Sequence, residues 1–163
     1  MTIAPKTTVV DYVGRTIDIS CFHGAGYGTD KQVDQAIAQP GEGGEVLTGI
    51  FKLAQRFLML LLTDKGSQPY NPDAGCPFMQ DARQGRWRTS TDVLQSFSFS
   101  MVDVKRQLRA LQLATDPPDE RFNGVTVLSI VLTAPDYVIL RLALVSEAGT
   151  KRAFIAPIPV TLR

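Results

Sequence analysis

The chain has 163 residues, of which 44% are hydrophobic and 20% are charged, a composition that excludes a disordered tail and a membrane protein. Its 17 basic and 16 acidic residues give a formal net charge of +1. That balance argues against a protein whose main task is to grip nucleic acid through phosphates. The length supports one full hydrophobic core, so we predict a single globular unit.

The first 45 residues are predicted to form an N-terminal arm, a short strand at Arg15–Phe22 and a glycine-rich connection. The arm contains no apolar run that is long enough for a signal peptide. The single histidine, His23, lies in the glycine-rich stretch, and we interpret it as incidental to a turn. Cys21 and Cys76 stand far apart, so we expect two reduced thiols, with a disulfide between them as the less favoured alternative.

A helix is predicted from Val46 to Thr63, because apolar residues recur there at spacings of three and four. Gly66 is well placed to close this helix. The following residues, 67–90, include three prolines and two glycines, and we predict a long loop without regular structure. A loop of this length inside a small domain is often functional.

The segment Thr91–Leu113 fits two patterns. Phe97, Phe99 and Met101 alternate with serines, which is typical of a strand. A longer series of apolar residues at spacings of three and four favours a second helix, with Thr91 as its N-cap. We predict the helix because its pattern extends over the whole segment.

The last third of the chain is predicted to form three strands, 125–132, 137–145 and 152–160, in an antiparallel meander. Pro157 and Pro159 place the last strand at an edge of the sheet or in an extended arm. The fold class is therefore α+β: two main amphipathic helices packed on a C-terminal, mainly antiparallel sheet, with an N-terminal arm and strand. We divide the chain into residues 1–45 and a domain of residues 46–163.

The sequence offers little material for catalysis. It contains no nucleophile elbow, no phosphate-binding glycine motif and no set of metal ligands, so we expect no enzyme, no cofactor and no metal. The densest acidic group, Asp116, Asp119 and Glu120, lies on a proline-rich turn. We interpret it as a solvated turn rather than as the facing pair of carboxylates that a glycosidase needs.

One basic patch is distinctive. Arg86 and Arg88 flank Trp87, and Arg83 lies just upstream. Arginine and tryptophan together could stack on a nucleic-acid base, but both are also enriched in protein–protein hot spots. Because the net charge is close to zero, we favour a protein interface at Trp87, Arg86 and Arg88.

Two local patterns occur in a particular order. The first is L-L-T-D-K-G-S at Leu61–Ser67, followed by Pro72, Gly75 and Phe78. The second is P-D-E-R-F at Pro118–Phe122, between an amphipathic helix and a hydrophobic strand. Over about residues 46–145 the chain resembles the small baseplate wedge subunit of contractile phage tails, a family sometimes labelled lysozyme-like. Asp64 stands where that family usually has proline, and Glu120 is joined directly to Arg121 without the usual proline between them.

The resemblance implies a structural role in the virion, in a tail baseplate assembled in the cytoplasm of the host bacterium. The implied partners are larger baseplate wedge subunits, the tail sheath protein and hub or tube-proximal proteins, with no nucleic acid and no membrane. It also implies a sheet edge on which sheath assembly begins. We expect the partner-binding residues to be Asp119, Glu120 and Arg121 on the turn, Trp87 with Arg86 and Arg88, and Pro157 and Pro159.

Two alternatives stay open at this point. One is another phage tail or adaptor module of similar fold that binds a single protein partner through its sheet edge. The other, more remote, is a peptidoglycan hydrolase that would use Asp119 and Glu120.

Overall fold

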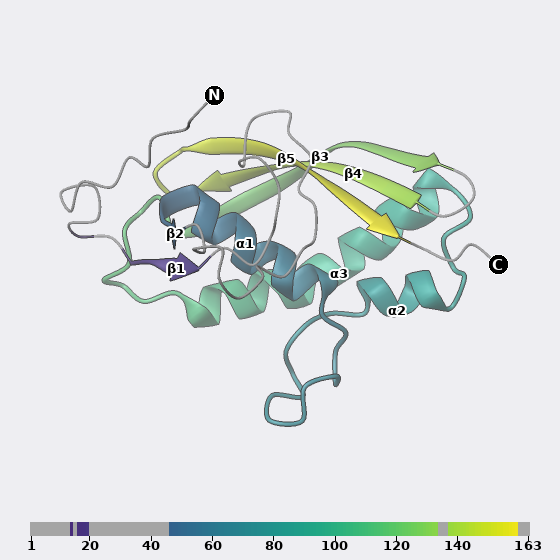
Figure 1. Ribbon diagram of the computed structural model, residues 1–163, viewed down its shortest axis with the longest axis horizontal. Helices are drawn as coiled ribbons and strands as arrows, with labels where there is room; N and C mark the ends of the chain where they lie inside the picture. Colours follow the sequence, from purple (N-terminus) through teal and green to yellow (C-terminus); the bar gives the residue numbers. More distant parts are fainter. Residues whose placement is uncertain (1–13, 15, 20–45, 134–136, 160–163) are drawn as a thin grey trace, which may run out of the picture.

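The computed structural model describes residues 14, 16–19, 46–133 and 137–159. The predictions for residues 20–45, which include Cys21 and His23, lie outside these described residues. Figure 1 shows a three-stranded sheet with helices packed on one of its faces. The elements in chain order are β1 (Asp18–Ile19), β2 (Val46–Leu47), α1 (Gly49–Leu62), α2 (Phe78–Arg83), α3 (Ser90–Leu111), β3 (Phe122–Thr133), β4 (Tyr137–Ser146) and β5 (Lys151–Pro159).

The predicted α+β class is confirmed. Strands β3, β4 and β5 form an antiparallel meander in that order, and β1 pairs with β2 in a separate small antiparallel sheet. Alternate residues of β4, which are Val138, Leu140, Leu142 and Leu144, are fully buried against the helices, as their spacing predicted. The sheet therefore has one face that belongs to the hydrophobic core.

Helices α1 and α3 pack against each other, and both also contact the sheet, α1 at β4 and α3 at β3. The ring of Phe57 stacks on Phe122 at 6.5 Å between centroids and meets the edge of Phe154 at 6.1 Å. Leu53, Leu58 and other apolar residues of α1 are buried as well. The helix is apolar on more than one side because it is buried on more than one side.

The second predicted helix is confirmed as α3, and the strand alternative for this segment is wrong. Its N-cap is Thr89 rather than Thr91. The Thr89 hydroxyl accepts a hydrogen bond from the Asp92 amide, and the Asp92 carboxylate accepts one from the Thr89 amide at 2.8 Å. This reciprocal pair is a capping box, so the helix begins earlier than the apolar pattern alone indicates.

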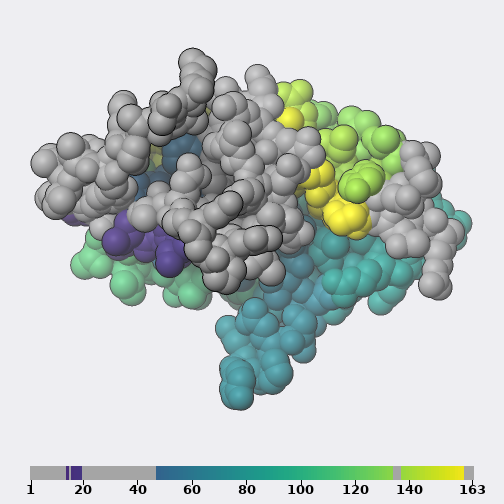
Figure 2. Space-filling model, viewed as in Figure 1, coloured from purple at the N-terminus to yellow at the C-terminus, as the bar shows by residue number. Residues whose placement is uncertain are grey.

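The absence of regular structure predicted over residues 67–90 is wrong in part, because α2 lies within that segment. Pro77 precedes this helix, and proline is tolerated at a helix start, where its missing N–H has no partner within the helix. The remainder of the segment before α2 forms a loop that projects away from the body of the molecule (Figures 1 and 2).

Strand β5 is an edge strand of the described sheet, as its prolines predicted. Pro157 pairs with Ile139 and Pro159 with Tyr137 in the register of the β4–β5 ladder. Neither proline has an N–H, so β5 offers no backbone donor at these two positions.

Candidate functional site

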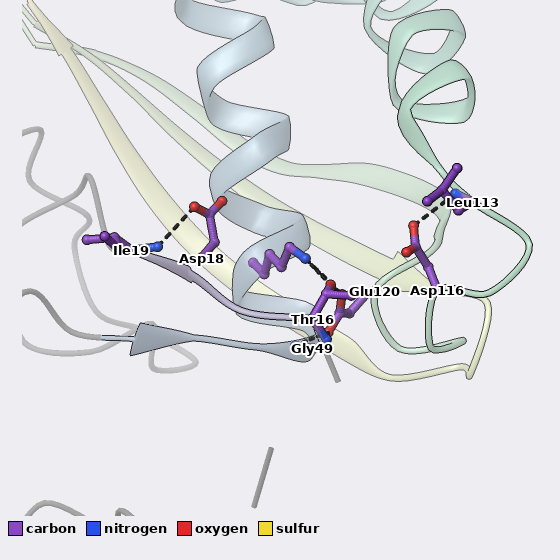
Figure 3. Close-up of polar contacts among 8 residues, drawn as sticks. Thr16, Asp18, Ile19, Gly49, Leu113, Asp116 and Glu120 are labelled. Carbon is purple, nitrogen blue, oxygen red and sulfur yellow. Dashed lines mark hydrogen bonds and ion pairs between the residues drawn. The ribbon is translucent and has the colours of Figure 1, made fainter. Parts of the chain in front are cut away.

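The side chain of Glu120 points into the molecule from the turn that precedes β3, and Glu120 is only 2% exposed. Its Oε1 accepts hydrogen bonds from the backbone amides of Thr16 at 3.2 Å and Gly49 at 3.3 Å. Its Oε2 accepts from Lys52 Nζ at 3.2 Å and from the Thr16 hydroxyl. Figure 3 shows Thr16, Gly49 and Glu120 converging at one end of α1. We call Thr16, Gly49, Lys52 and Glu120 the buried polar cluster, because all of them except the exposed Thr16 are buried.

The buried polar cluster performs a structural task that explains the position of Glu120. The N-cap residue of α1, Thr48, makes no side-chain capping hydrogen bond. The carboxylate of Glu120 takes that place, because it accepts from the Gly49 amide and sets a negative charge at the positive end of the helix dipole. The partner-binding role expected of Glu120 is therefore corrected. Its carboxylate is buried and forms its hydrogen bonds with residues of the same chain.

The Lys52 ammonium balances this buried carboxylate. Lys52 is 3% exposed, and its Nζ also donates to the Thr16 hydroxyl. A buried carboxylate or ammonium is tolerated only when it is paired and hydrogen-bonded. The cluster thus fastens the segment around Thr16 and the start of α1 to the turn before β3.

Arg121 points toward a different neighbour. Its Nε lies 3.1 Å from Glu147 Oε2, in the turn between β4 and β5. The Arg121 carbonyl accepts from the Glu147 amide at 2.9 Å, and the Pro118 carbonyl accepts from the Ala148 amide at 3.1 Å. The two turns are thereby held together, while the side chains of Arg121 and Glu147 keep partial access to solvent. Asp119, which directly precedes Glu120 in the sequence, is half-buried.

Trp87 is a core residue and not an exposed anchor. It is 1% exposed, and its ring lies 4.5 Å from that of Phe78 between centroids. The neighbouring Arg86 is exposed and pairs with Asp81 at 2.8 Å, and Arg88 is exposed. The prediction that Trp87 contacts a partner is therefore corrected, because Trp87 is buried. Of the three residues expected at this interface, only Arg86 and Arg88 reach the surface.

We define residues 64–76 as the projecting loop. Its base is formed by residues of the L-L-T-D-K-G-S pattern together with Gly75 and Cys76. At this base the Cys76 amide donates to the Thr63 carbonyl at 2.9 Å, and the Lys65 amide donates to the Cys76 carbonyl at 3.3 Å. Neither bond uses the amide of Asp64. Asp64 instead forms an ion pair with Arg83.

Gly75 makes the base of the projecting loop compact. Its φ is +85°, and a Cβ at this position would lie 2.2 Å from the Thr63 carbonyl oxygen. On its other side the amide side chain of Gln107, in α3, accepts from the Gly75 amide at 2.9 Å and donates to the Gly75 carbonyl at 2.7 Å. Only glycine fits between these two contacts.

The tip of the projecting loop is a β-turn with a free aromatic side chain. The Asn71 amide donates to the Gln68 carbonyl at 3.1 Å, which places Pro69 and Tyr70 at the two central positions of the turn. The Gly66 amide donates to the Pro72 carbonyl at 3.0 Å and closes the loop below the tip. Tyr70 has an exposed fraction of 103%, so its side chain stands entirely in solvent.

Cys76 is a free thiol in the core, where its Sγ donates to the Leu61 carbonyl at 3.3 Å. Burial raises the pKa of this thiol above its usual range. Within residues 14, 16–19, 46–133 and 137–159, no three His, Cys, Asp or Glu side chains gather in a way that could hold a metal ion. No helix in the same part of the chain is both long and apolar enough to cross a membrane.

Comparisons of this chain with protein-family models, with curated proteins and with solved structures give no match. The structure brings Glu120 together with Lys52 and Arg121 together with Glu147. Pro157 and Pro159 lie at the end of the β4–β5 ladder that is farther from Glu147. Tyr70 was missed by sequence reasoning; its position between two prolines in a loop was the available signal.

Proposed function

We propose that this protein is a non-catalytic structural subunit of a contractile phage tail baseplate, in which it joins larger wedge subunits and contacts the tail sheath. The observation that carries the proposal is the projecting loop. Two residues that carry the resemblance to the wedge family have fixed places at the loop base: Gly75 has no room for a side chain, and Phe78 is buried. The resemblance thus includes residues that shape one structural feature, the base of the projecting loop.

Exposed apolar residues support an assembled state. On the outer side of α3, Phe99 and Val102 are 67% and 70% exposed, and they lie three residues apart on one helical face. Neighbouring exposed apolar residues on a helix mark a surface that gains from being covered by another protein. A subunit built into a larger particle provides such a cover.

The edges of the sheet support pairing with another protein through β3. Within the described sheet β3 has a neighbour on one side only, and at 12 residues it is longer than β4 or β5. Its ladder shifts register around Asn123 and again around Leu128. Because Pro157 and Pro159 remove two donors from β5, we assign the edge that receives a sheath segment to β3.

The state of Glu120 speaks against the hydrolase alternative. A general acid must reach a substrate, whereas both carboxylate oxygens of Glu120 are buried and accept hydrogen bonds from within the chain. Asp119 alone would leave the reaction without its second carboxylate.

Co-expression tests the proposal. The tagged chain is produced together with the proteins encoded by neighbouring tail genes, and complexes are separated by size-exclusion chromatography. We expect a stable complex with a larger wedge subunit, and we expect the double variant F99S/V102S to weaken it more than Gln95→Ser, which alters an exposed polar residue of the same helix. A chain that stays monomeric with every candidate would contradict the proposal.

A further inference from the structure

The projecting loop has features that folding does not require. Residues 65–73 are all exposed, and they contribute no side chain to the hydrophobic core. Figure 2 shows the loop standing out from the rest of the described surface. A protein that needed only to connect α1 with α2 could do so with a shorter and flatter segment, because most connections in compact domains have only a few residues.

The loop is nevertheless held in one shape. Its base is fastened by the paired backbone of Thr63, Lys65 and Cys76 and by the Gln107 amide on Gly75. Its tip is held by the turn from Gln68 to Asn71, and proline at the second position of a turn presets the backbone angle. A preformed loop loses little conformational freedom on binding, which favours affinity.

The chemistry of the tip selects the kind of partner. Residues 66–73 contain no lysine or arginine and one acid, Asp73, so the tip has no positive charge to attract a phosphate or an anionic lipid surface. A tyrosine provides a rigid apolar ring and a hydroxyl, and it is among the residues most enriched at the centres of protein–protein interfaces.

We propose that the projecting loop is a docking finger, and that Tyr70 inserts into a pocket of a neighbouring protein in the same assembly. The pocket has apolar walls for the ring and a hydrogen-bonding group at its floor for the hydroxyl. This inference rests on the proposed function, because it takes the neighbour to be a baseplate protein. It adds the contact residue and the chemistry that the neighbour must present.

The test uses the co-expressed complex with three variants of the full chain. Tyr70→Ser removes ring and hydroxyl, Tyr70→Phe removes only the hydroxyl, and Gln68→Ser changes the adjacent exposed side chain as a matched control. Because Tyr70 makes no contact that stabilises the chain, all three variants should keep the melting temperature of the parent. We expect Tyr70→Ser to weaken the complex roughly tenfold or more, Tyr70→Phe to weaken it less, and Gln68→Ser to leave it unchanged.

A photoreactive benzoylphenylalanine at position 70 identifies the neighbour. We expect a crosslink from position 70 to the larger subunit and none from position 84, which is exposed on the body of the protein. If the complex forms equally well with Tyr70→Ser and position 70 gives no crosslink, the proposal that the loop docks through Tyr70 is wrong, while the proposed function stands. Failure of the parent chain to form any complex overturns both.

Discussion

Lys52 and Glu120 are 68 residues apart in the sequence and meet inside the molecule, where Lys52 Nζ lies 3.2 Å from Glu120 Oε2. The pair joins the first turn of α1 to the turn that begins the sheet. Thr16 completes the contact from the N-terminal side of the chain. Three separate parts of the sequence therefore depend on one buried carboxylate, which also serves as the missing cap of α1.

Removing that carboxylate should be costly for stability. In Glu120→Ala the Lys52 ammonium is left buried without its counter-charge, and we expect the free energy of unfolding to fall by about 3–5 kcal/mol. Glu120→Gln keeps an acceptor for the amides of Thr16 and Gly49 and should lose less. Urea denaturation followed by circular dichroism measures both losses. A loss below about 1 kcal/mol in Glu120→Ala would show that the pair is not required.

Arg121→Ala should affect assembly more than folding. The guanidinium and the Glu147 carboxylate are partly exposed, at 29% and 44%, so water screens their attraction. We expect a loss of at most about 1 kcal/mol in the free energy of unfolding. Glu147→Ala is the matched control, because it breaks the same ion pair from the other side. If Arg121 binds a partner, only its own replacement should weaken the co-expressed complex; equal weakening by both variants would mean that the ion pair is merely structural.

Two glycines of the projecting loop offer a clean comparison. Gly66 and Gly75 have φ values of +82° and +85°, but a Cβ on Gly66 would meet nothing within 4 Å, whereas one on Gly75 would meet the Thr63 carbonyl. Gly66→Ala should cost about 1–2 kcal/mol from the backbone angle alone. Gly75→Ala should cost clearly more, because the backbone at the loop base must also move. Equal losses in thermal denaturation would contradict the close contact.

The cap of α3 should be measurable at neutral pH. Thr89→Ala removes the hydroxyl that accepts from the Asp92 amide, and we expect the free energy of unfolding to fall by about 1 kcal/mol. In a domain of this size that corresponds to a fall of roughly 2–4 °C in the melting temperature. Thr91→Ala is the control, since Thr91 lies inside the helix and is not its cap. A larger effect at Thr91 would restore the cap that the sequence indicated.

The same cap predicts a pH dependence. The Thr89 side chain, followed by the backbone amides of Thr89 and Arg88, holds the pKa of the Asp92 carboxyl below its usual value of 3.8. The stabilisation is therefore fully present above pH 3.8, the usual value in the unfolded chain, and is lost as the pH falls through the lower pKa of the folded state. The difference in stability between the parent and Asp92→Asn should shrink in this acidic window. A difference that stays constant down to pH 2 would contradict the assignment.

Periodicity predicted the helices and strands well, because their apolar residues repeat at fixed spacings on one buried face. Val138, Leu140, Leu142 and Leu144 are an example, and the prolines of β5 correctly marked an edge. Elements fixed by a few polar bonds were harder to predict. The start of α3 depends on Thr89 with Asp92, and α2 is short and follows Pro77.

The site was less predictable because burial depends on contacts that are distant in sequence. Glu120 lies on a turn of polar and proline residues, where a carboxylate is usually solvated. In the folded chain it is buried and paired with Lys52 and Thr16, which are distant in sequence. Trp87 lies between two arginines in the sequence, yet it is buried in the core, where it packs against Phe78. Tyr70 is the opposite case: an aromatic residue that the fold leaves wholly outside.

The proposed place of this protein in a baseplate can be tested by a cryo-electron microscopy reconstruction of tails from cells that carry this gene and its neighbours. We expect several copies of this fold in the baseplate wedge, each with the projecting loop against a larger wedge subunit and β3 beside a strand from the sheath. A complete baseplate and sheath that contain no density for this chain would contradict it.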